Sequence, residues 1–199
     1  TLLGQNVNAW GRDLLPDIRT EFGELLRACD AVEGIERIRF TSPHPKDFRG
    51  PVIAAMAECD AVCEHAHLPL QSGSSRILKA MRRTYDRERY LRLVGELRTA
   101  IPDLALTTDL IVGFPGETED DFRETLEVVE EVGFDGAFTF VYSPRAGTEA
   151  AAMAEQITRR DFIRVSAAAA AMPVAACVPR PFPVRSPNTS AIPDRDEGL

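Results

Sequence analysis

The sequence predicts an α/β fold on a parallel sheet, in the form of a barrel, a partial barrel or an open doubly wound sheet. Short apolar segments alternate with amphipathic helical patterns, and such alternation indicates right-handed βαβ units. Each apolar segment is followed by polar residues or glycine, as expected where strand ends form a ligand site. The length of 199 residues, 44% of them hydrophobic, suits one globular domain or one domain with a tail.

The expected elements follow from periodicity and from residues that begin or end helices. Apolar positions at helical spacing predict a helix over 18–32, which Gly34 would end. Pro51 can open the next helix, and Ser74 or Ser75 and then Asp86 can cap the two after it. The five expected strands are residues 1–3, 35–41, 67–70, 104–112 and 137–142.

The stretch Leu104–Phe122 is the most informative part of the chain. It reads as a strand, a Gly113-Phe114-Pro115-Gly116 turn and the start of a helix over about 119–132, where Thr118 and Asp121 can cap reciprocally and Phe122, Leu126 and Val129 face inward. The two glycines permit close approach of a ligand to the backbone. The acids that follow occupy the position of a bound anion, so a neutral ring is a better guest than a phosphate.

Asp109 carries the only charge of that strand. It shares a face with Thr107 and Ile111, so we expect it to point into the barrel or cleft, where it needs a partner or water. Two readings stay open, a ligand role and a structural ion pair with Arg39 or Arg145. The polar residues that should converge at one end of the sheet are Gln5, Asn6, Ser42, His44, Gln71, Ser72, Asp109 and Arg145.

Charge and cysteine content limit the classes of function. Acidic residues outnumber Lys and Arg by 31 to 23, which argues against a chain that provides most of the contacts to nucleic-acid phosphates. The four cysteines do not form a disulfide scaffold, and Cys29 is expected to be packed on a helical face. Cys59 and Cys63, with His65 and His67 nearby, leave a zinc site as a minor alternative.

Six motifs carry a resemblance to a known family. Over about residues 1–156, the chain resembles the radical S-adenosylmethionine methylthiotransferases, and within them the tRNA-2-methylthio-N6-dimethylallyladenosine synthase type. The motifs are Leu3-Gly-Gln-Asn-Val-Asn8, Arg39-Phe-Thr-Ser-Pro-His-Pro45, His67-Leu-Pro-Leu-Gln-Ser-Gly-Ser74, Met81-Arg-Arg-Thr-Tyr85, Thr108-Asp-Leu-Ile-Val-Gly-Phe-Pro-Gly-Glu-Thr118 and Tyr142-Ser-Pro-Arg-Ala-Gly-Thr148.

The resemblance implies a partial β/α barrel in which a 4Fe-4S cluster cleaves S-adenosylmethionine to a radical. That radical leads to a methylthio group at C2 of an isopentenylated adenine in tRNA. The resemblance also implies that Gly4-Gln5-Asn6 lies near the methionine part of the cofactor, Gln71 and Ser72 near the ribose, and Ile111 to Phe114 near the adenine. The residues expected to bind the cofactor are Gln5, Asn6, Ser42, Gln71, Ser72, Asp109, Gly113 and Phe114. No catalytic residue is singled out.

The chain also departs from this family. The C-x-x-x-C-x-x-C loop that holds the cluster is not in the sequence, and Cys59 and Cys63 fall in the segment ahead of the strand at 67–70. We therefore expect an internal fragment, with residues 1–156 forming a partial barrel incomplete at its N-terminal end. Cluster cysteines and the main tRNA-binding parts would lie outside it, so the fragment alone should be inactive.

Residues 157–199 are expected to be a separate tail. Arg159-Arg160, an Ala-rich run and Cys177 resemble a twin-arginine lipoprotein signal in a misplaced position, or a join of two reading frames. The apolar run is too short to span a membrane, and a cytoplasmic protein is expected. Two alternatives to the enzyme fragment are a non-catalytic remnant that at most binds S-adenosylmethionine and the sister methylthiotransferase acting on a ribosomal protein.

Overall fold

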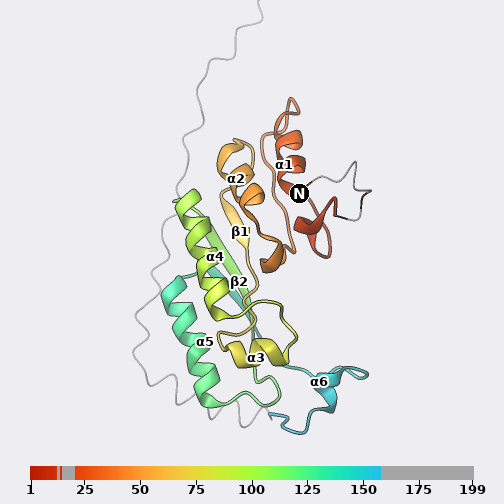
Figure 1. Ribbon diagram of the computed structural model, residues 1–199, viewed down its shortest axis with the longest axis vertical. Helices are drawn as coiled ribbons and strands as arrows, with labels where there is room; N and C mark the ends of the chain where they lie inside the picture. Colours follow the sequence, from red (N-terminus) through yellow and green to blue (C-terminus); the bar gives the residue numbers. More distant parts are fainter. Residues whose placement is uncertain (13, 15–20, 158–199) are drawn as a thin grey trace, which may run out of the picture.

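The computed structural model describes residues 1–12, 14 and 21–157 and contains a parallel sheet flanked by helices (Figure 1). The sheet has the order β1-β2-β3, with β1 at His65–His67, β2 at Ala105–Val112 and β3 at Gly136–Val141. Both pairings are parallel. The predicted parallel α/β arrangement is therefore confirmed.

The two N-terminal segments expected as strands extend this arrangement without forming regular strands. Leu2 pairs with Phe40, and Ile38 pairs with Val62, each through one isolated parallel bridge. The five extended segments thus follow one another in chain order, but the prediction of full strands at 1–3 and 35–41 is wrong. Each neighbour offers only a short stretch for hydrogen bonding, so no continuous ladder forms.

The third expected strand begins two residues earlier than predicted, at His65. Beyond His67 the chain stays beside β2, since Leu68 donates to Thr107 O at 2.7 Å and Gln71 donates to Asp109 O at 2.8 Å. Between them the Leu70 N–H donates to the Thr108 side-chain hydroxyl at 2.9 Å, which interrupts the backbone ladder. Residues 65–71 therefore form one extended segment that delivers Gln71 to the carboxyl end of the sheet.

The helices lie mainly on the outer face of the sheet. Figure 1 shows α4 and α5 beside each other along β2, with α3 and α6 together at the end where the strands finish. Asp86 and Thr118 cap α4 and α5 as predicted, and Gly133 ends α5 in the left-handed conformation. The helices are η1 (Val7–Ala9), α1 (Phe22–Asp30), η2 (Pro45–Asp47), α2 (Gly50–Glu58), α3 (Ser75–Ala80), α4 (Arg87–Ala100), α5 (Glu119–Val132) and α6 (Glu149–Ala152).

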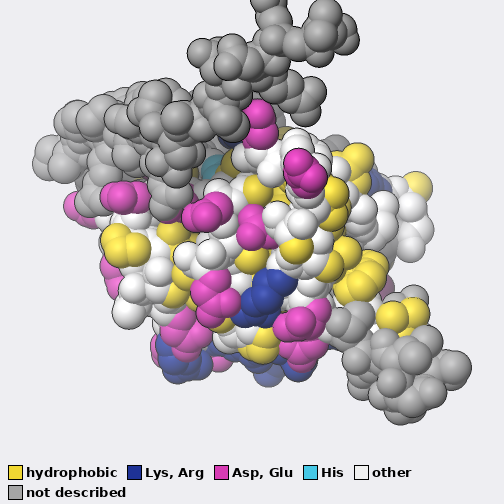
Figure 2. Space-filling view, turned by 90° about the horizontal axis from the view of Figure 1, so that it is seen from above, with side chains coloured by type: hydrophobic (Ala, Val, Ile, Leu, Met, Phe, Trp, Pro, Cys, Tyr) yellow, Lys and Arg dark blue, Asp and Glu magenta, His cyan; other side chains and the backbone are white. Residues whose placement is uncertain are grey.

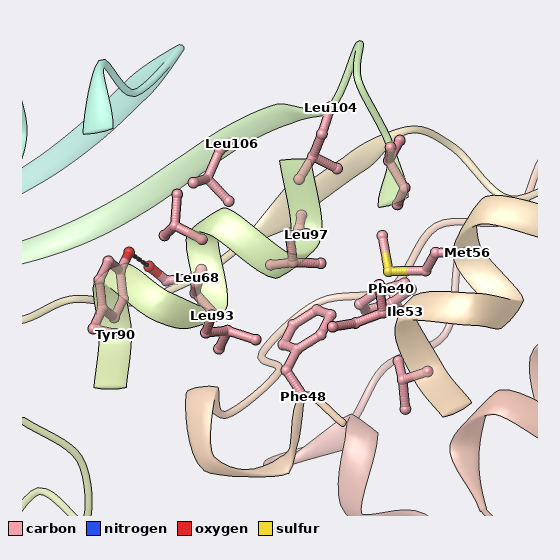
Figure 3. Close-up of a cluster of buried hydrophobic side chains, with 14 of the residues drawn as sticks. Phe40, Phe48, Ile53, Met56, Leu68, Tyr90, Leu93, Leu97, Leu104 and Leu106 are labelled. Carbon is pink, nitrogen blue, oxygen red and sulfur yellow. Dashed lines mark hydrogen bonds between the residues drawn. The ribbon is translucent and has the colours of Figure 1, made fainter. Parts of the chain in front are cut away.

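The core lies between the sheet and these helices (Figure 3). Leu97 of α4 and Leu106 of β2 are fully buried, and Met56 of α2 joins them from the N-terminal side. Tyr90 is also fully buried, and its hydroxyl donates to Leu68 O at 2.7 Å. Burial of the phenol is therefore compatible with a satisfied polar group. Cys29 packs against the core as predicted.

The inward face predicted for helix α5 is confirmed only in part. Val129 packs against the core and Phe122 is half-buried, but Leu126 is 38% exposed. The buried positions are Asp121, Thr125, Val128 and Val132. The apolar periodicity misleads because Asp121 and Thr125 bind a loop and are thus stable in buried positions. Ser74 precedes α3 as expected, but its hydroxyl donates to Asp121 at 2.6 Å and makes no cap.

The features predicted for residues 158–199, including Arg159-Arg160 and Cys177, lie outside the described residues, and the proposed boundary near 156 stays a prediction. Among the residues that the structure does describe, no helix is both long and apolar enough to cross a membrane.

Candidate functional site

The loop Gln71–Ser74 is fixed against helix α5. The N–H of Gly73 donates to the Thr125 hydroxyl at 2.8 Å, and the Ser72 hydroxyl lies 3.4 Å from the same atom. A Cβ on Gly73 would lie 2.5 Å from both Glu124 O and Thr125 Cα, so only glycine fits this approach. Contact with α5 therefore sets the position of Gln71.

A cleft of about 560 Å³ opens beside this loop, at the carboxyl ends of the strands. Gln71, Asp109 and Ile111 form one wall, and aromatic residues of the last strand and its following turn form the other. Its volume is in the range of small-molecule sites, and a few polar groups among apolar ones are typical of them. The lining residues are Gln71, Asp109, Ile111, Phe140, Val141, Tyr142, Ser143, Arg145, Thr148 and Ala150.

The turn after β2 closes one end of this region. Gly113 and Gly116 have φ of 73° and 80°, as the predicted tight turn requires. Phe114 is buried and stacks edge-on against Tyr142, with ring centroids 5.2 Å apart. Phe114 and Tyr142 also line a second hollow of about 370 Å³, which shares Ile111 with the cleft. The turn thus contributes the aromatic side chain of Phe114 to the hollow next to the cleft.

Glu117 stabilises the turn through a hydrogen bond to its backbone. Its carboxylate accepts from the Gly113 N–H, and its other oxygen is buried without a partner among the described residues. Burial raises the pKa of Glu117 to about 7, against a usual value of 4.5, and the backbone N–H groups of Gly113 and Phe114 oppose this rise only in part. The carboxyl group beneath the turn therefore changes charge near neutral pH.

Asp109 faces the cleft as predicted, but its predicted ion-pair partners are wrong. Neither Arg39 nor Arg145 pairs with it; His67 Nε2 lies 3.2 Å from Asp109 Oδ2. In the parallel register His67 stands opposite Thr107, so Asp109 is the next residue along on the same face and within reach. His65 and His67 lie two residues apart on one strand, as Thr107 and Asp109 do on the next, and this spacing was the sequence signal for the contact.

The predicted site residues fall into two groups. Gln71 and Asp109 line the cleft, Phe114 lines the neighbouring hollow, and Gly113 lies in the turn between β2 and Phe114 without lining either cavity. The hydroxyl of Ser72 lies beside that of Thr125 on α5. The other three, Gln5, Asn6 and Ser42, lie on the N-terminal segments and do not line the described cavities.

The carboxylate of Asp47, which was not predicted from the sequence, fixes the loop that carries Asn6. Asn6 donates to Asp47 Oδ2 at 2.6 Å, and Arg12 forms an ion pair with the same carboxylate. Hydrogen bonds from Asn6 and Arg12 hold the pKa of Asp47 below its usual value, although burial opposes them. Val7 donates to Ser42 O, which brings the loops of Asn6 and Ser42 together.

Two of the predicted site residues adopt strained backbone conformations. Ser42 has φ of 55° and Gln71 has φ of 70°, a region that residues other than glycine seldom occupy. Such strain costs about 1–3 kcal/mol per residue and gathers at ligand sites. Both residues stand at the carboxyl end of an extended segment, where the sequence placed the site.

The described residues provide no metal site. Among residues 1–12, 14 and 21–157, no three His, Cys, Asp or Glu side chains come together in a metal-binding arrangement. The zinc alternative for Cys59, Cys63, His65 and His67 is therefore not supported. The same residues do not fit an iron–sulfur cluster, which needs three or four thiolates.

Comparison with known proteins identifies the family. The pattern of the radical SAM superfamily matches residues 15–129, more than half of the chain. The chain belongs to the radical SAM superfamily. Members of this superfamily use S-adenosylmethionine together with an iron–sulfur cluster.

Two similar curated relatives are named for the same activity. The chain is 63% identical over 159 residues to the tRNA-2-methylthio-N(6)-dimethylallyladenosine synthase of Thermobifida fusca and 58% identical over 170 residues to synthase 1 of Mycobacterium marinum. These matches cover 80% of this chain but 32% of each relative. The chain therefore spans about a third of the length of these relatives, and the family predicted from the motifs is confirmed.

Solved structures confirm the fold. The radical SAM enzyme coproporphyrinogen III oxidase (HemN) of Escherichia coli matches 74% of this chain with a TM-score of 0.54 and 18% identity, and the match covers 34% of that protein. SuiB of Streptococcus suis matches 84% of the chain with a TM-score of 0.53 and 14% identity, again over 34% of its length. The predicted partial barrel of the radical SAM type is thus consistent with both.

The surface of the described residues is not predominantly basic. On the face shown in Figure 2, basic side chains lie among acidic ones. Among the described residues, ion pairs of surface side chains include Arg87 with Glu127 and Arg123 with Asp120. The charge distribution agrees with the overall excess of acids.

Proposed function

We propose that this chain is the cofactor-binding part of a tRNA methylthiotransferase, which adds a methylthio group to C2 of N6-isopentenyladenosine by radical SAM chemistry. Identity of 57–63% over most of the chain to proteins named for that activity carries the proposal. The proposed protein works in the cytoplasm, where tRNA is modified, and binds tRNA mainly through parts outside this chain.

The cleft suits S-adenosylmethionine in chemistry as well as size. Ile111, Phe114 and Tyr142 offer apolar and aromatic surface to the adenine, and Gln71 offers an amide to the ribose. Asp109 places a carboxylate where a cationic sulfonium or amino group would be stabilised. When bound, the cofactor supplies the radical. The described residues would bind and orient the cofactor, and the iron–sulfur cluster would be held by residues other than these.

Cofactor binding by the 199-residue chain tests the first half of the proposal. We expect isothermal titration with S-adenosylmethionine to show weak binding that Asp109→Asn reduces about tenfold or more, as for loss of a charged hydrogen bond. Asp103→Asn, at an exposed position before β2, is the matched control and should bind like the unaltered chain. Equal affinity of the Asp109 variant and the unaltered chain would contradict the assignment of Asp109.

A chimera tests the reaction itself. Residues 1–157 of this chain would replace the matching segment of the Thermobifida fusca synthase, and mass spectrometry of tRNA nucleosides would follow 2-methylthio-N6-isopentenyladenosine. Product formation supports an active catalytic segment. A folded chimera that retains its clusters but yields no product would contradict the proposal and support a non-catalytic remnant.

A further inference from the structure

A continuous chain of polar side chains crosses the inner face of the sheet beside the cleft. Thr107 Oγ1 lies 3.0 Å from His67 Nδ1 and 3.3 Å from His65 Nε2. His67 Nε2 in turn lies 3.2 Å from Asp109 Oδ2. The Thr107 hydroxyl thus joins the two histidines of β1 by hydrogen bonds, and an ion-pair contact joins His67 to the cleft carboxylate.

The backbone register creates this line. His67 pairs with Thr107 across the parallel strands, and residues two apart on each strand share a face. The methyl group of Thr107 lies on the side of Gly136 in β3, at 3.5 Å from the position a Cβ there would take. The hydroxyl of Thr107 is therefore directed toward β1, between the two imidazoles.

The hydrogen-bond roles along the line allow two arrangements with the same number of protons. In the first, His65 is an imidazolium whose Nε2–H donates to Thr107, the Thr107 hydroxyl donates to His67 Nδ1, and His67 Nε2–H donates to the Asp109 carboxylate. In the second, every hydrogen bond is reversed: the Asp109 carboxylic acid donates to His67 Nε2, His67 Nδ1–H to Thr107, and Thr107 to His65 Nε2. Neutral His65 then carries its proton on Nδ1.

Conversion between these arrangements moves one proton between Asp109 and His65 along these contacts. One O–H or N–H bond breaks and one forms at each link, so the proton that leaves the Asp109 carboxyl group is matched by a proton gained at His65, and the two ends become a carboxylate and an imidazolium. We propose that Asp109, His67, Thr107 and His65 form a proton relay that takes a proton from, or returns it to, an N–H, O–H or S–H group of a ligand held in the cleft.

The groups around the far end favour passage of the proton onward. His65 is half-buried, and burial, Arg39 and His67 lower its pKa, while Asp135 opposes them. The lowered pKa favours release of a proton that reaches His65. Arg39 comes from the segment packed beside β1, and Asp135 precedes β3, so charges from both flanks of the sheet act on this imidazole.

The relay rests on the same cleft as the proposed function, but its test needs no ligand, so the two can fail separately. The chain contains three histidines, and His44 lies outside the relay, where its ring accepts from the Lys46 N–H. Long-range proton–nitrogen NMR spectra of the 15N-histidine-labelled 199-residue chain resolve ring tautomers and titrations, with His44 as the internal control.

The decisive measurement is a double-mutant cycle read at His65. We expect Asp109→Asn to change the titration midpoint of His65 by about 0.3–0.5 pH units, although the two residues are not in contact, because their titrations are coupled through the relay. Thr107→Val should abolish that response, Thr107→Ser should restore it, and Thr139→Val on β3 should leave it intact. Amide spectra report whether each variant is folded.

Two results would overturn the relay. One is an unchanged His65 midpoint in the Asp109 variant. The other is a response that persists in the Thr107→Val background, which would show that the coupling acts through space and does not use the hydroxyl.

Discussion

Replacement of Gly73 by Ala tests whether contact with α5 positions the cleft loop. The new Cβ would lie 2.5 Å from Glu124 O and Thr125 Cα and 2.8 Å from Glu124 C. All three atoms belong to the backbone, so no side chain can rotate away and either the loop or the helix must retreat. The φ of Gly73 is not among the positive values, so alanine brings no backbone strain of its own.

The structure sets the size of the effect. Overpacking costs about 1–3 kcal/mol, and weakening of the Gly73–Thr125 hydrogen bond adds about 1 kcal/mol, so we expect a loss of about 2–4 kcal/mol. With a urea m-value of about 2 kcal/mol/M, the unfolding midpoint should fall by about 1–2 M.

The assay is urea unfolding followed by circular dichroism, with Gly95→Ala as the matched control. Gly95 lies within α4, and a Cβ there would meet nothing within 4 Å. The control should therefore gain about 0.5–1 kcal/mol from helix propensity. A Gly73→Ala midpoint equal to or above that of the unaltered chain, at an unchanged m-value, would refute the argument.

Two further predictions concern the turn and the strand beside the cleft. Because the native pKa of Glu117 is about 7 and its usual value is 4.5, the folded state binds the proton more tightly, and Glu117 contributes stability below pH 4.5 that is lost as pH rises through 7. Glu117→Gln should flatten the decline of urea midpoints between pH 5 and 8, and a parallel decline in both proteins would contradict this. Buried Thr108 accepts from Leu70 N and donates to Leu68 O, each at 2.9 Å. Thr108→Val should cost about 1–3 kcal/mol by the same assay, against about 0.5 kcal/mol or less for exposed Thr139→Val, and equal losses would count against the hydrogen bonds.

The periodicity of the sequence was sufficient to predict the order of helices and strands and to place the site at the carboxyl end of the strands. Alternating apolar segments predicted a parallel sheet, and the Thr118–Asp121 pattern predicted the capping box at the start of α5. These features depend on neighbours in sequence, since capping and strand alternation act over a few residues. The same locality made it possible to place Asp109 on the cleft face before its surroundings were known.

Contacts between distant segments were beyond the sequence. The burial of Asp121 and Thr125 on α5 depends on hydrogen bonds from residues 73 and 74. Hydrophobicity alone does not predict that these two polar residues are buried. Full strands at 1–3 and 35–41 were expected from composition, but a strand also needs a partner of matching length.

The cleft shows the same division. By itself the sequence determined that Gln71 and Phe114 follow strands and that Asp109 lies within one, on the face of the cleft, because strand direction and alternation are local properties. Only the tertiary structure decided that His67 and not an arginine meets Asp109, because the register between β1 and β2 sets which side chains face each other. The same register places the Thr107 hydroxyl between His67 and His65, so hydrogen bonds connect His65 to that pair.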